Sequence, residues 1–188
     1  MTKRSRRVLQ QMNLPNKLSL IRILLVPLLV VFLLGGKALT RWNDIIALVV
    51  FIVAAITDWL DGYIARNAKQ VTTLGKFLDP VADKLLISAA FISLVEINRV
   101  PAWIVVIIVG REIMVTGMRS IAAAQQIIIP ASRLGKYKVG FETAAIIALI
   151  LDLPYNVGII AAWLAMTMAV ISGADHLIRF KKEIDLEW

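Results

Sequence analysis

Long blocks of apolar residues constrain the fold of this chain more than any other feature, because each block can cross a membrane. The chain has 188 residues, of which 59% are apolar, and its mean hydropathy is +0.78. Soluble domains contain roughly 45–50% apolar residues, whereas a membrane-spanning helix needs about 20 predominantly apolar residues. We therefore expect an all-α polytopic membrane protein, with residues 1–188 forming a single domain.

Six segments are apolar and long enough for membrane-spanning helices, and a basic segment precedes the first of them. Residues 1–16 place Val8, Leu9 and Met12 among several arginines. This pattern predicts a short amphipathic helix that lies on the surface of an anionic membrane. The expected spans cover residues 19–34, 43–66, 74–94, 101–123, 139–151 and 155–178.

The basic residues outside the spans predict the orientation of the chain. One side of the membrane would hold only Lys37, Arg41 and Arg99, whereas the connections on the opposite side and both ends carry clusters of lysine and arginine. Because basic residues collect on the cytoplasmic side of a membrane, we expect both ends in the cytoplasm. The expected location is a bacterial cytoplasmic membrane. This topology accounts for the net charge of +8, and we expect no nucleic-acid partner.

Four aspartates lie within or beside two of the predicted spans. Asp58 and Asp61 are three residues apart and Asp79 and Asp83 are four apart, so each pair shares one face of a helix. A charged group at the centre of a membrane helix costs roughly 2.5–3.5 kcal/mol, and such groups usually serve a function. If the two spans form a hairpin with its turn near residue 70, the four carboxylates converge in the cytoplasmic half of the membrane.

Four carboxylates so close together need positive charge nearby to remain ionised. Oxygen ligands without nearby histidine, in a chain that has no cysteine, favour Mg²⁺ or Mn²⁺. Four acids suit two metal ions about 3.5–4 Å apart, an arrangement that enzymes use for displacement at phosphorus. The alternative is a buried network of ion pairs with Arg66, Lys76 and Lys84.

The residues that follow the first acidic pair fit a phosphate ligand. Gly62 lets a ligand approach the helix, although close packing between membrane helices would also explain a glycine here. Ala65 keeps the same face narrow, and Arg66 is placed to bind a phosphate oxygen.

The whole pattern resembles the signature of the CDP-alcohol phosphatidyltransferases. It reads Asp58-Trp-Leu-Asp61-Gly62-Tyr-Ile-Ala65-Arg66, followed at the family's spacing by Gly75, Asp79 and Asp83. The resemblance implies six spans, a homodimer, and displacement of CMP from a CDP-linked lipid by an alcohol with two divalent cations. It implies that Asp58, Asp61 and Asp79 bind the metals, and that Asp83 is the general base and also touches the second metal. The residues that would surround the CDP-lipid are Asn16, Gly62, Ala65, Arg66, Thr72 and Gly75.

Segments outside the signature resemble the family members that use glycerol 3-phosphate as the acceptor alcohol. These segments begin at Pro15, Gly110 and Leu134, and the last departs from the usual pattern at Val139, where a threonine is common. Four cations at or near the spans exceed what one diphosphate requires, which also favours an anionic acceptor. The residues expected to bind its phosphate are Arg111, Arg119, Lys136 and Lys138.

These polar residues have simpler explanations as well. Lys136 and Lys138 would also fit positive-inside anchors, and Arg111 would also fit a buried ion pair with Glu112. His176, the single histidine, is expected at the boundary of the last span.

The sequence thus predicts transfer of a phosphatidyl group from CDP-diacylglycerol to glycerol 3-phosphate by one direct displacement. Asp83 would accept the proton of the attacking hydroxyl, because no histidine or cysteine lies near the acids. Inositol phosphate is the alternative acceptor. An Asp-rich intramembrane prenyltransferase would usually carry a second, distant acidic cluster, and a cation transporter usually shows inverted repeats; this sequence contains neither.

Overall fold

The computed structural model describes residues 14–35, 42–68, 73–125, 127, 132–154 and 156–184. It does not describe the side chains of residues 14–16, 58–68, 73–79, 133 and 184, where the backbone is helical. The described residues contain only helices and connections and no strand, which confirms the all-α prediction. The helices are α2 (Leu14–Leu34), α4 (Asn43–Ala68), α5 (Thr73–Glu96), α6 (Ala102–Ala124), α7 (Arg133–Ile150) and α8 (Val157–Ile184). The surface helix predicted for residues 1–16 falls almost entirely outside the described part.

Each of these helices overlaps one predicted span, but three of them extend five or six residues further into polar sequence than apolarity indicated. α2 already begins at Leu14, and α8 continues to Ile184. α7 begins at Arg133, because the side chain of Ser132 accepts a hydrogen bond from the backbone N–H of Gly135 (3.1 Å) and caps the helix. The polar residues before the fifth predicted span are therefore helical.

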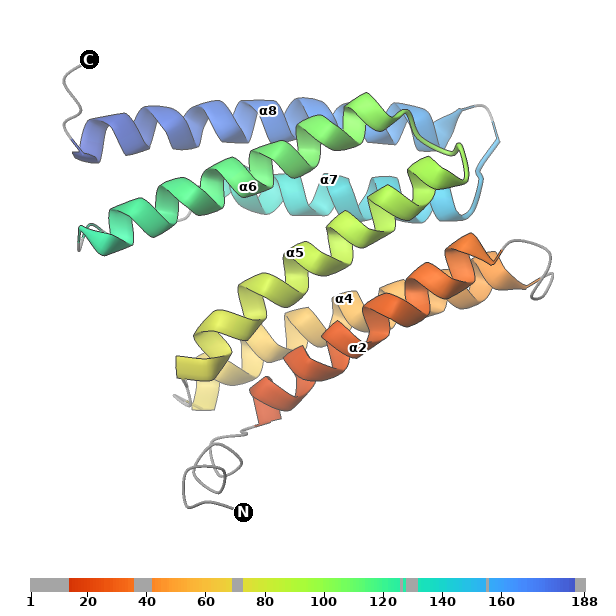
Figure 1. The fold of residues 1–188 in the computed structure, drawn as a ribbon, viewed down its shortest axis with the longest axis horizontal. Coiled ribbons are helices and arrows are strands. Elements are labelled where there is room, and N and C mark those ends of the chain that lie inside the picture. Colours follow the sequence, from red (N-terminus) through yellow and green to blue (C-terminus); the bar gives the residue numbers. More distant parts are fainter. Residues whose placement is uncertain are drawn as a thin grey trace. The chain divides into compact units, whose positions relative to one another are not determined.

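The chain divides into two compact units, residues 1–93 and 94–188. In the first unit α2 packs against α4, and α5 belongs to this unit as far as Ser93. In the second unit α8 packs against both α6 and α7. Figure 1 labels the helices in chain order. The four aspartates lie in the first unit, and the four cations expected to bind the acceptor lie in the second.

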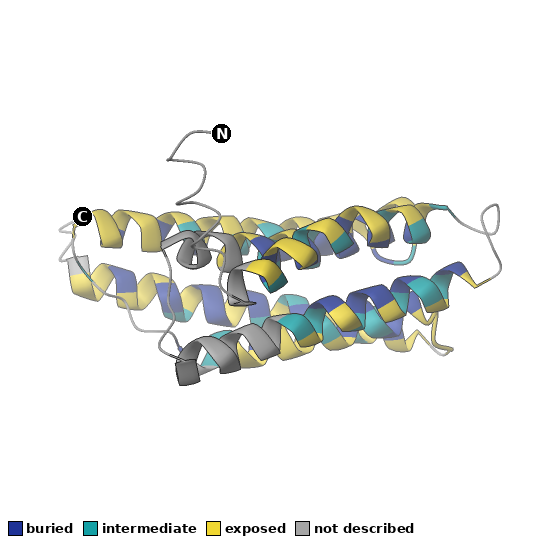
Figure 2. Ribbon diagram, turned by 90° about the horizontal axis from the view of Figure 1, so that it is seen from below, coloured by how far each residue is buried: buried dark blue, intermediate teal, exposed yellow. Residues whose placement is uncertain are grey.

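Large aliphatic side chains are exposed on every helix among the described residues. Figure 2 colours all exposed residues yellow, whatever their type. Leu24, Val106 and Ile178, for example, are 66–68% exposed. Small side chains such as Ala54 and Ala165 are instead fully buried where helices meet. Small residues at helix contacts, with large apolar side chains facing outward, are typical of helices surrounded by lipid.

Two helices contain segments long and apolar enough to cross a membrane, Lys17–Leu34 in α2 and Val157–Glu183 in α8. α4 contains a shorter apolar stretch, Asn43–Thr57, which ends directly before Asp58. Over the described residues, α5, α6 and α7 contain no segment that meets the same criterion. These observations support a membrane protein, while the number of six spans stays a prediction.

Candidate active site

The four aspartates of the predicted site lie on two helices of the first unit. The backbone of α4 is helical through Asp58 and Asp61, and that of α5 is helical through Asp79 and Asp83. Spacings of three and four residues therefore place the members of each pair on one helix face. Residues 69–72 and the side chains of the first three aspartates lie outside the described part, so the convergence of the carboxylates stays a prediction.

The residues of the family signature form one stripe along each helix. On α4 the spacing from Asp58 is three, four, seven and eight residues, which is the repeat of a single helix face. On α5 the members follow one another at intervals of four. The stripes consist of Asp58, Asp61, Gly62, Ala65 and Arg66 on α4, and of Gly75, Asp79 and Asp83 on α5. Of the other two residues expected around the CDP-lipid, Asn16 lies in the first turn of α2, and Thr72 lies outside the described residues.

Asp83 has a described side chain, and it contacts an arginine from another helix. Its Oδ1 accepts a hydrogen bond from Nη1 of Arg22 on α2. The side chain of Arg22 is fully buried, whereas that of Asp83 is 44% exposed. The ion pair therefore joins α2 to α5 and leaves part of the carboxylate accessible. From the sequence, Arg22 was only the last residue of the family-like segment that begins at Pro15, because nothing local connects it with a residue 61 positions away.

A second group of charged side chains lies within the second unit, around Glu112 of α6. Glu112 accepts hydrogen bonds from its neighbour Arg111 and from Lys138 of α7. Lys138 also pairs with Glu142, one turn further along α7 (3.0 Å). The side chains of Lys138 and Glu142 are only 4% and 1% exposed. Two cations and two carboxylates thus balance one another in a buried position, and the Arg111–Glu112 ion pair considered from the sequence is present.

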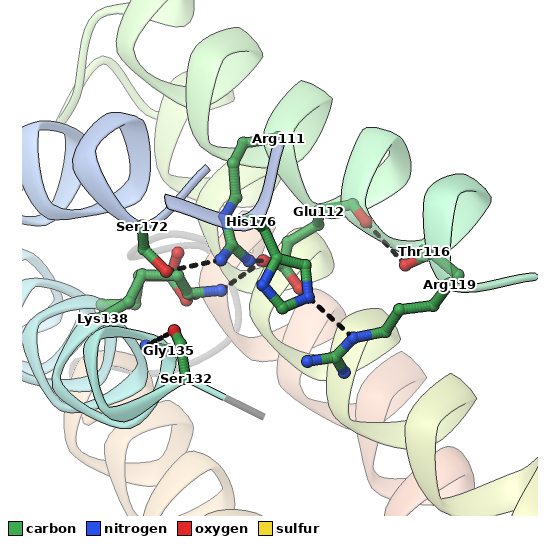
Figure 3. Close-up of polar contacts among 10 residues, drawn as sticks. Arg111, Glu112, Thr116, Arg119, Ser132, Gly135, Lys138, Ser172 and His176 are labelled. Atoms are coloured by element: carbon green, nitrogen blue, oxygen red, sulfur yellow. Dashed lines mark hydrogen bonds and ion pairs between the residues drawn. The ribbon is translucent and has the colours of Figure 1, made fainter. Parts of the chain in front are cut away.

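α8 supplies two further partners to this cluster. Nη2 of Arg111 donates a hydrogen bond to Oγ of Ser172 (2.7 Å), and Nε of Arg119 donates one to Nε2 of His176 (3.0 Å). Figure 3 shows both arginines of α6 reaching these side chains of α8. The sequence predicted His176 at the boundary of the last span. α8 continues beyond this residue to Ile184, and His176 itself is buried (2% exposed).

Arg119 and Lys136 have a different charge environment from Arg111 and Lys138. Both residues are exposed, and neither forms an ion pair with a carboxylate in the part of the chain that the structure describes. Of the four cations predicted to bind a phosphate, two therefore carry charge that none of the described acids balances.

Three polar residues of this cluster had no role assigned from the sequence: Glu142, Ser172 and His176. Glu142 offered a usable signal, because an acid four residues after a lysine on a helix pairs with it. Ser172 and His176 offered no local signal, since their partners on α6 are 61 and 57 residues away along the chain.

Comparison with known proteins identifies the family. The model of the CDP-alcohol phosphatidyltransferase family matches residues 12–171, a range that includes all four aspartates and extends over both units. The chain belongs to the CDP-alcohol phosphatidyltransferase family. It is therefore an enzyme of the phosphatidyltransferase class, as the resemblance indicated.

Several bacterial relatives are similar to the chain over most of its length. The CDP-diacylglycerol–glycerol-3-phosphate 3-phosphatidyltransferase of Bacillus subtilis is 40% identical over 179 residues, covering 87% of this chain and 93% of the relative. The protein of the same name from Rickettsia felis is 35% identical, covering 90% of this chain and 96% of the relative. A probable phosphatidylglycerophosphate synthase of Mycobacterium tuberculosis is 37% identical, covering 92% and 83%.

Proposed function

We propose that the chain transfers the phosphatidyl group of CDP-diacylglycerol to glycerol 3-phosphate, which yields phosphatidylglycerophosphate and CMP. The observation that carries this proposal is the similarity, over most of the chain, to relatives whose names specify this donor and this acceptor. The stripes of signature residues on α4 and α5 support the same reaction class, because they keep acids and a phosphate-binding arginine at helical spacing.

We expect the aspartates to hold two divalent cations, Mg²⁺ or Mn²⁺. Two carboxylate pairs on continuous helices offer hard oxygen ligands, which both of these cations prefer. The expected ligands are Asp58, Asp61 and Asp79, with Asp83 touching the second cation. When bound, the cations would neutralise the diphosphate and stabilise CMP as it leaves.

Asp83 has the separate role of general base. Its partly exposed carboxylate would accept the proton of the attacking glycerol hydroxyl at a distance of about 2.6–3.2 Å. The hydroxyl oxygen bonds to the phosphorus of the phosphatidyl group while the bond from that phosphorus to CMP breaks. Arg22 holds the carboxylate in place from α2. A single displacement of this kind inverts the configuration at phosphorus and forms no covalent enzyme intermediate.

The phosphate of the acceptor is assigned to the basic residues of the second unit. Arg119 and Lys136 would supply the net positive charge, because no described acid pairs with them. Arg111 and Lys138 would contribute N–H donors, while their carboxylate partners keep the surroundings neutral. The sequence alone does not distinguish these four cations from one another.

The membrane topology is part of the same proposal. We expect six spans, a surface helix in residues 1–16, and both ends and the active site on the cytoplasmic side of a bacterial cytoplasmic membrane. The distribution of lysine and arginine supports the orientation, and the exposed aliphatic side chains support contact with lipid. A homodimer is expected from the family resemblance alone.

A transfer assay with the purified chain in mixed micelles tests the proposal. Radiolabelled CDP-diacylglycerol is offered with glycerol 3-phosphate, inositol phosphate or serine, with Mg²⁺, with Mn²⁺ and with EDTA. We expect product with glycerol 3-phosphate, loss of product in EDTA, and recovery when the metal is restored. Product with inositol phosphate alone would establish the alternative acceptor, and absence of product with every alcohol would refute the proposal.

Replacement of the aspartates tests the metal ligands in the same assay. Asp58→Asn, Asp61→Asn and Asp79→Asn should each abolish turnover while the protein still folds, because each removes one charged ligand. Asp152→Asn is the matched control, since Asp152 follows α7 at a φ of 47°, a conformation that asparagine tolerates. A rate near that of the unchanged chain in any of the first three variants would contradict the assignment.

A further inference from the structure

His176 of α8 presents an acceptor nitrogen to Arg119 of α6. Because the Nε atom of an arginine always carries a hydrogen, Nε2 of His176 accepts the hydrogen bond between them (3.0 Å). The imidazole is therefore neutral, with its proton on Nδ1. His176 is 2% exposed, so the residues around it restrict the movement of the ring.

A neutral partner leaves the charge of Arg119 intact. Arg111 is balanced by Glu112, and Lys138 by Glu112 and Glu142. Arg119 has no carboxylate partner among the described residues, so its charge is available to a ligand. A carboxylate at position 176 would hold the guanidinium equally well but would cancel that charge.

The same turn of α8 also holds Arg111. Ser172, four residues before His176, accepts a hydrogen bond from Arg111. Gly173 leaves room for the side chain of Arg111, since a Cβ at position 173 would lie 3.1 Å from Cγ of that arginine. Arg111 and Arg119 are eight residues apart, about 12 Å along α6, whereas their partners are about 6 Å apart along α8. The two hydrogen bonds thereby draw the ends of both arginine side chains toward the same stretch of α8.

A buried donor in this cluster also points to an anionic ligand. Nε of Arg111 is buried and has no hydrogen-bond partner among the described residues. It carries a hydrogen, so the group that satisfies it must be an acceptor, such as a phosphate oxygen. The family match ends at residue 171, so Ser172, Gly173 and His176 lie directly beyond it.

We propose that His176 is a positioning residue that orients Arg119 toward the phosphate of the acceptor alcohol without neutralising it, and that Ser172 positions Arg111 in the same cluster. This inference rests on the proposed function, because it takes the acceptor to be glycerol 3-phosphate. His176 acts through Arg119 and not on the reacting atoms. α8 therefore sets the affinity for the acceptor and leaves that for CDP-diacylglycerol unchanged.

Three substitutions at position 176 separate orientation from charge. His176→Gln keeps a neutral acceptor, His176→Leu removes the acceptor, and His176→Glu keeps the acceptor but adds a negative charge. We expect the KM for glycerol 3-phosphate to rise less than threefold in the glutamine variant and at least tenfold in the other two. The KM for CDP-diacylglycerol and kcat at saturating acceptor should stay within twofold. Arg179→Met, which removes an exposed ion pair on the same helix, is the control and should change none of these values.

A double-variant cycle tests the same point without burying a new charge. Arg119→Gln should raise the KM for glycerol 3-phosphate, and adding His176→Leu should raise it no further, because His176 acts only through Arg119. A merely structural bond predicts instead that glutamate restores the KM as well as glutamine does, or that the two losses multiply. Either result would overturn the inference.

The proposed function and this inference can fail separately. If the unchanged chain transfers to no phosphorylated alcohol, both are refuted. If it transfers to glycerol 3-phosphate with a KM that is insensitive to position 176, only the inference is refuted.

Discussion

At the scale of single residues, the three arginines described in and around the candidate site differ in what balances their charge. Arg22 is fully buried against the half-exposed carboxylate of Asp83, Arg111 is paired with the adjacent Glu112, and Arg119 meets a neutral imidazole. Because a charged group that is already paired inside a protein has less to gain from a second anion, we expect these partners to determine which arginine attracts a substrate.

The role of Asp83 can be separated from the stability of the fold. Asp83→Asn keeps an oxygen that can accept the hydrogen bond from Arg22 but removes the basic carboxylate. We expect kcat to fall by at least about 10²-fold, the low end for loss of a general base, with little change in the binding of CDP-diacylglycerol. Steady-state kinetics beside equilibrium binding of the lipid measure the two effects, and a kcat close to that of the unchanged chain would assign the base elsewhere.

Gly173 offers a test of the packing around Arg111. In Gly173→Ala the new Cβ would lie 3.1 Å from Cγ and 3.8 Å from Nε of Arg111, so the arginine side chain must move by a few tenths of an ångström. We expect a several-fold rise in the KM for glycerol 3-phosphate without loss of folded protein. Gly140→Ala on α7 is the matched control, because no atom lies within 4 Å of its added Cβ. An equal effect of the two substitutions would show that helix propensity, not contact with Arg111, is responsible.

At the scale of elements, the ends of the helices depend on polar contacts that hydropathy does not register. Ser132 caps the start of α7, and Arg99, in the connection before α6, donates hydrogen bonds from Nη1 to the carbonyl oxygens of Leu149 (3.3 Å) and Ile150 (2.7 Å) at its end. Carbonyls in the last turn of a helix have no partner within that helix, although the one of Leu149 also accepts a hydrogen bond from the backbone N–H of Asp152 (3.3 Å). The side chain of Arg99 thus joins the connection before α6 to the end of α7.

Removing this cap should destabilise the second unit. We expect Arg99→Met to lower the free energy of unfolding by about 1.5–3 kcal/mol, the usual contribution of hydrogen bonds to a charged group. Arg179→Met removes an exposed ion pair with Asp175, a kind of contact that adds little to stability, and serves as the control. Unfolding of both variants in the same detergent measures the difference, and equal stability of the two would show that the bonds from Arg99 add nothing to the fold.

At the scale of the whole molecule, the absence of cysteine allows the topology to be tested directly. Ser5→Cys and Lys182→Cys should react with a membrane-impermeant maleimide only from the cytoplasmic face, and Lys37→Cys only from the opposite face. This result follows from six spans and the distribution of basic residues. The labelling is measured separately in right-side-out and in inside-out membrane vesicles. Labelling of positions 5 and 182 from opposite faces would require an odd number of spans and would contradict the prediction.

The features that depend on neighbouring residues could be predicted from the sequence alone. Apolar blocks placed the helices, the spacing of Asp58, Asp61, Asp79 and Asp83 set their faces, and the signature identified the family, because periodicity and motif spacing are local properties. Tertiary structure decided which charges meet. The pairs that join Arg22 to Asp83, Arg111 to Ser172 and Arg119 to His176 bridge 57 to 61 residues. No local pattern encodes such contacts, because each pair forms only where different helices pack together. Which partner each of these cations meets is therefore a property of the packed helices, not of any segment within them.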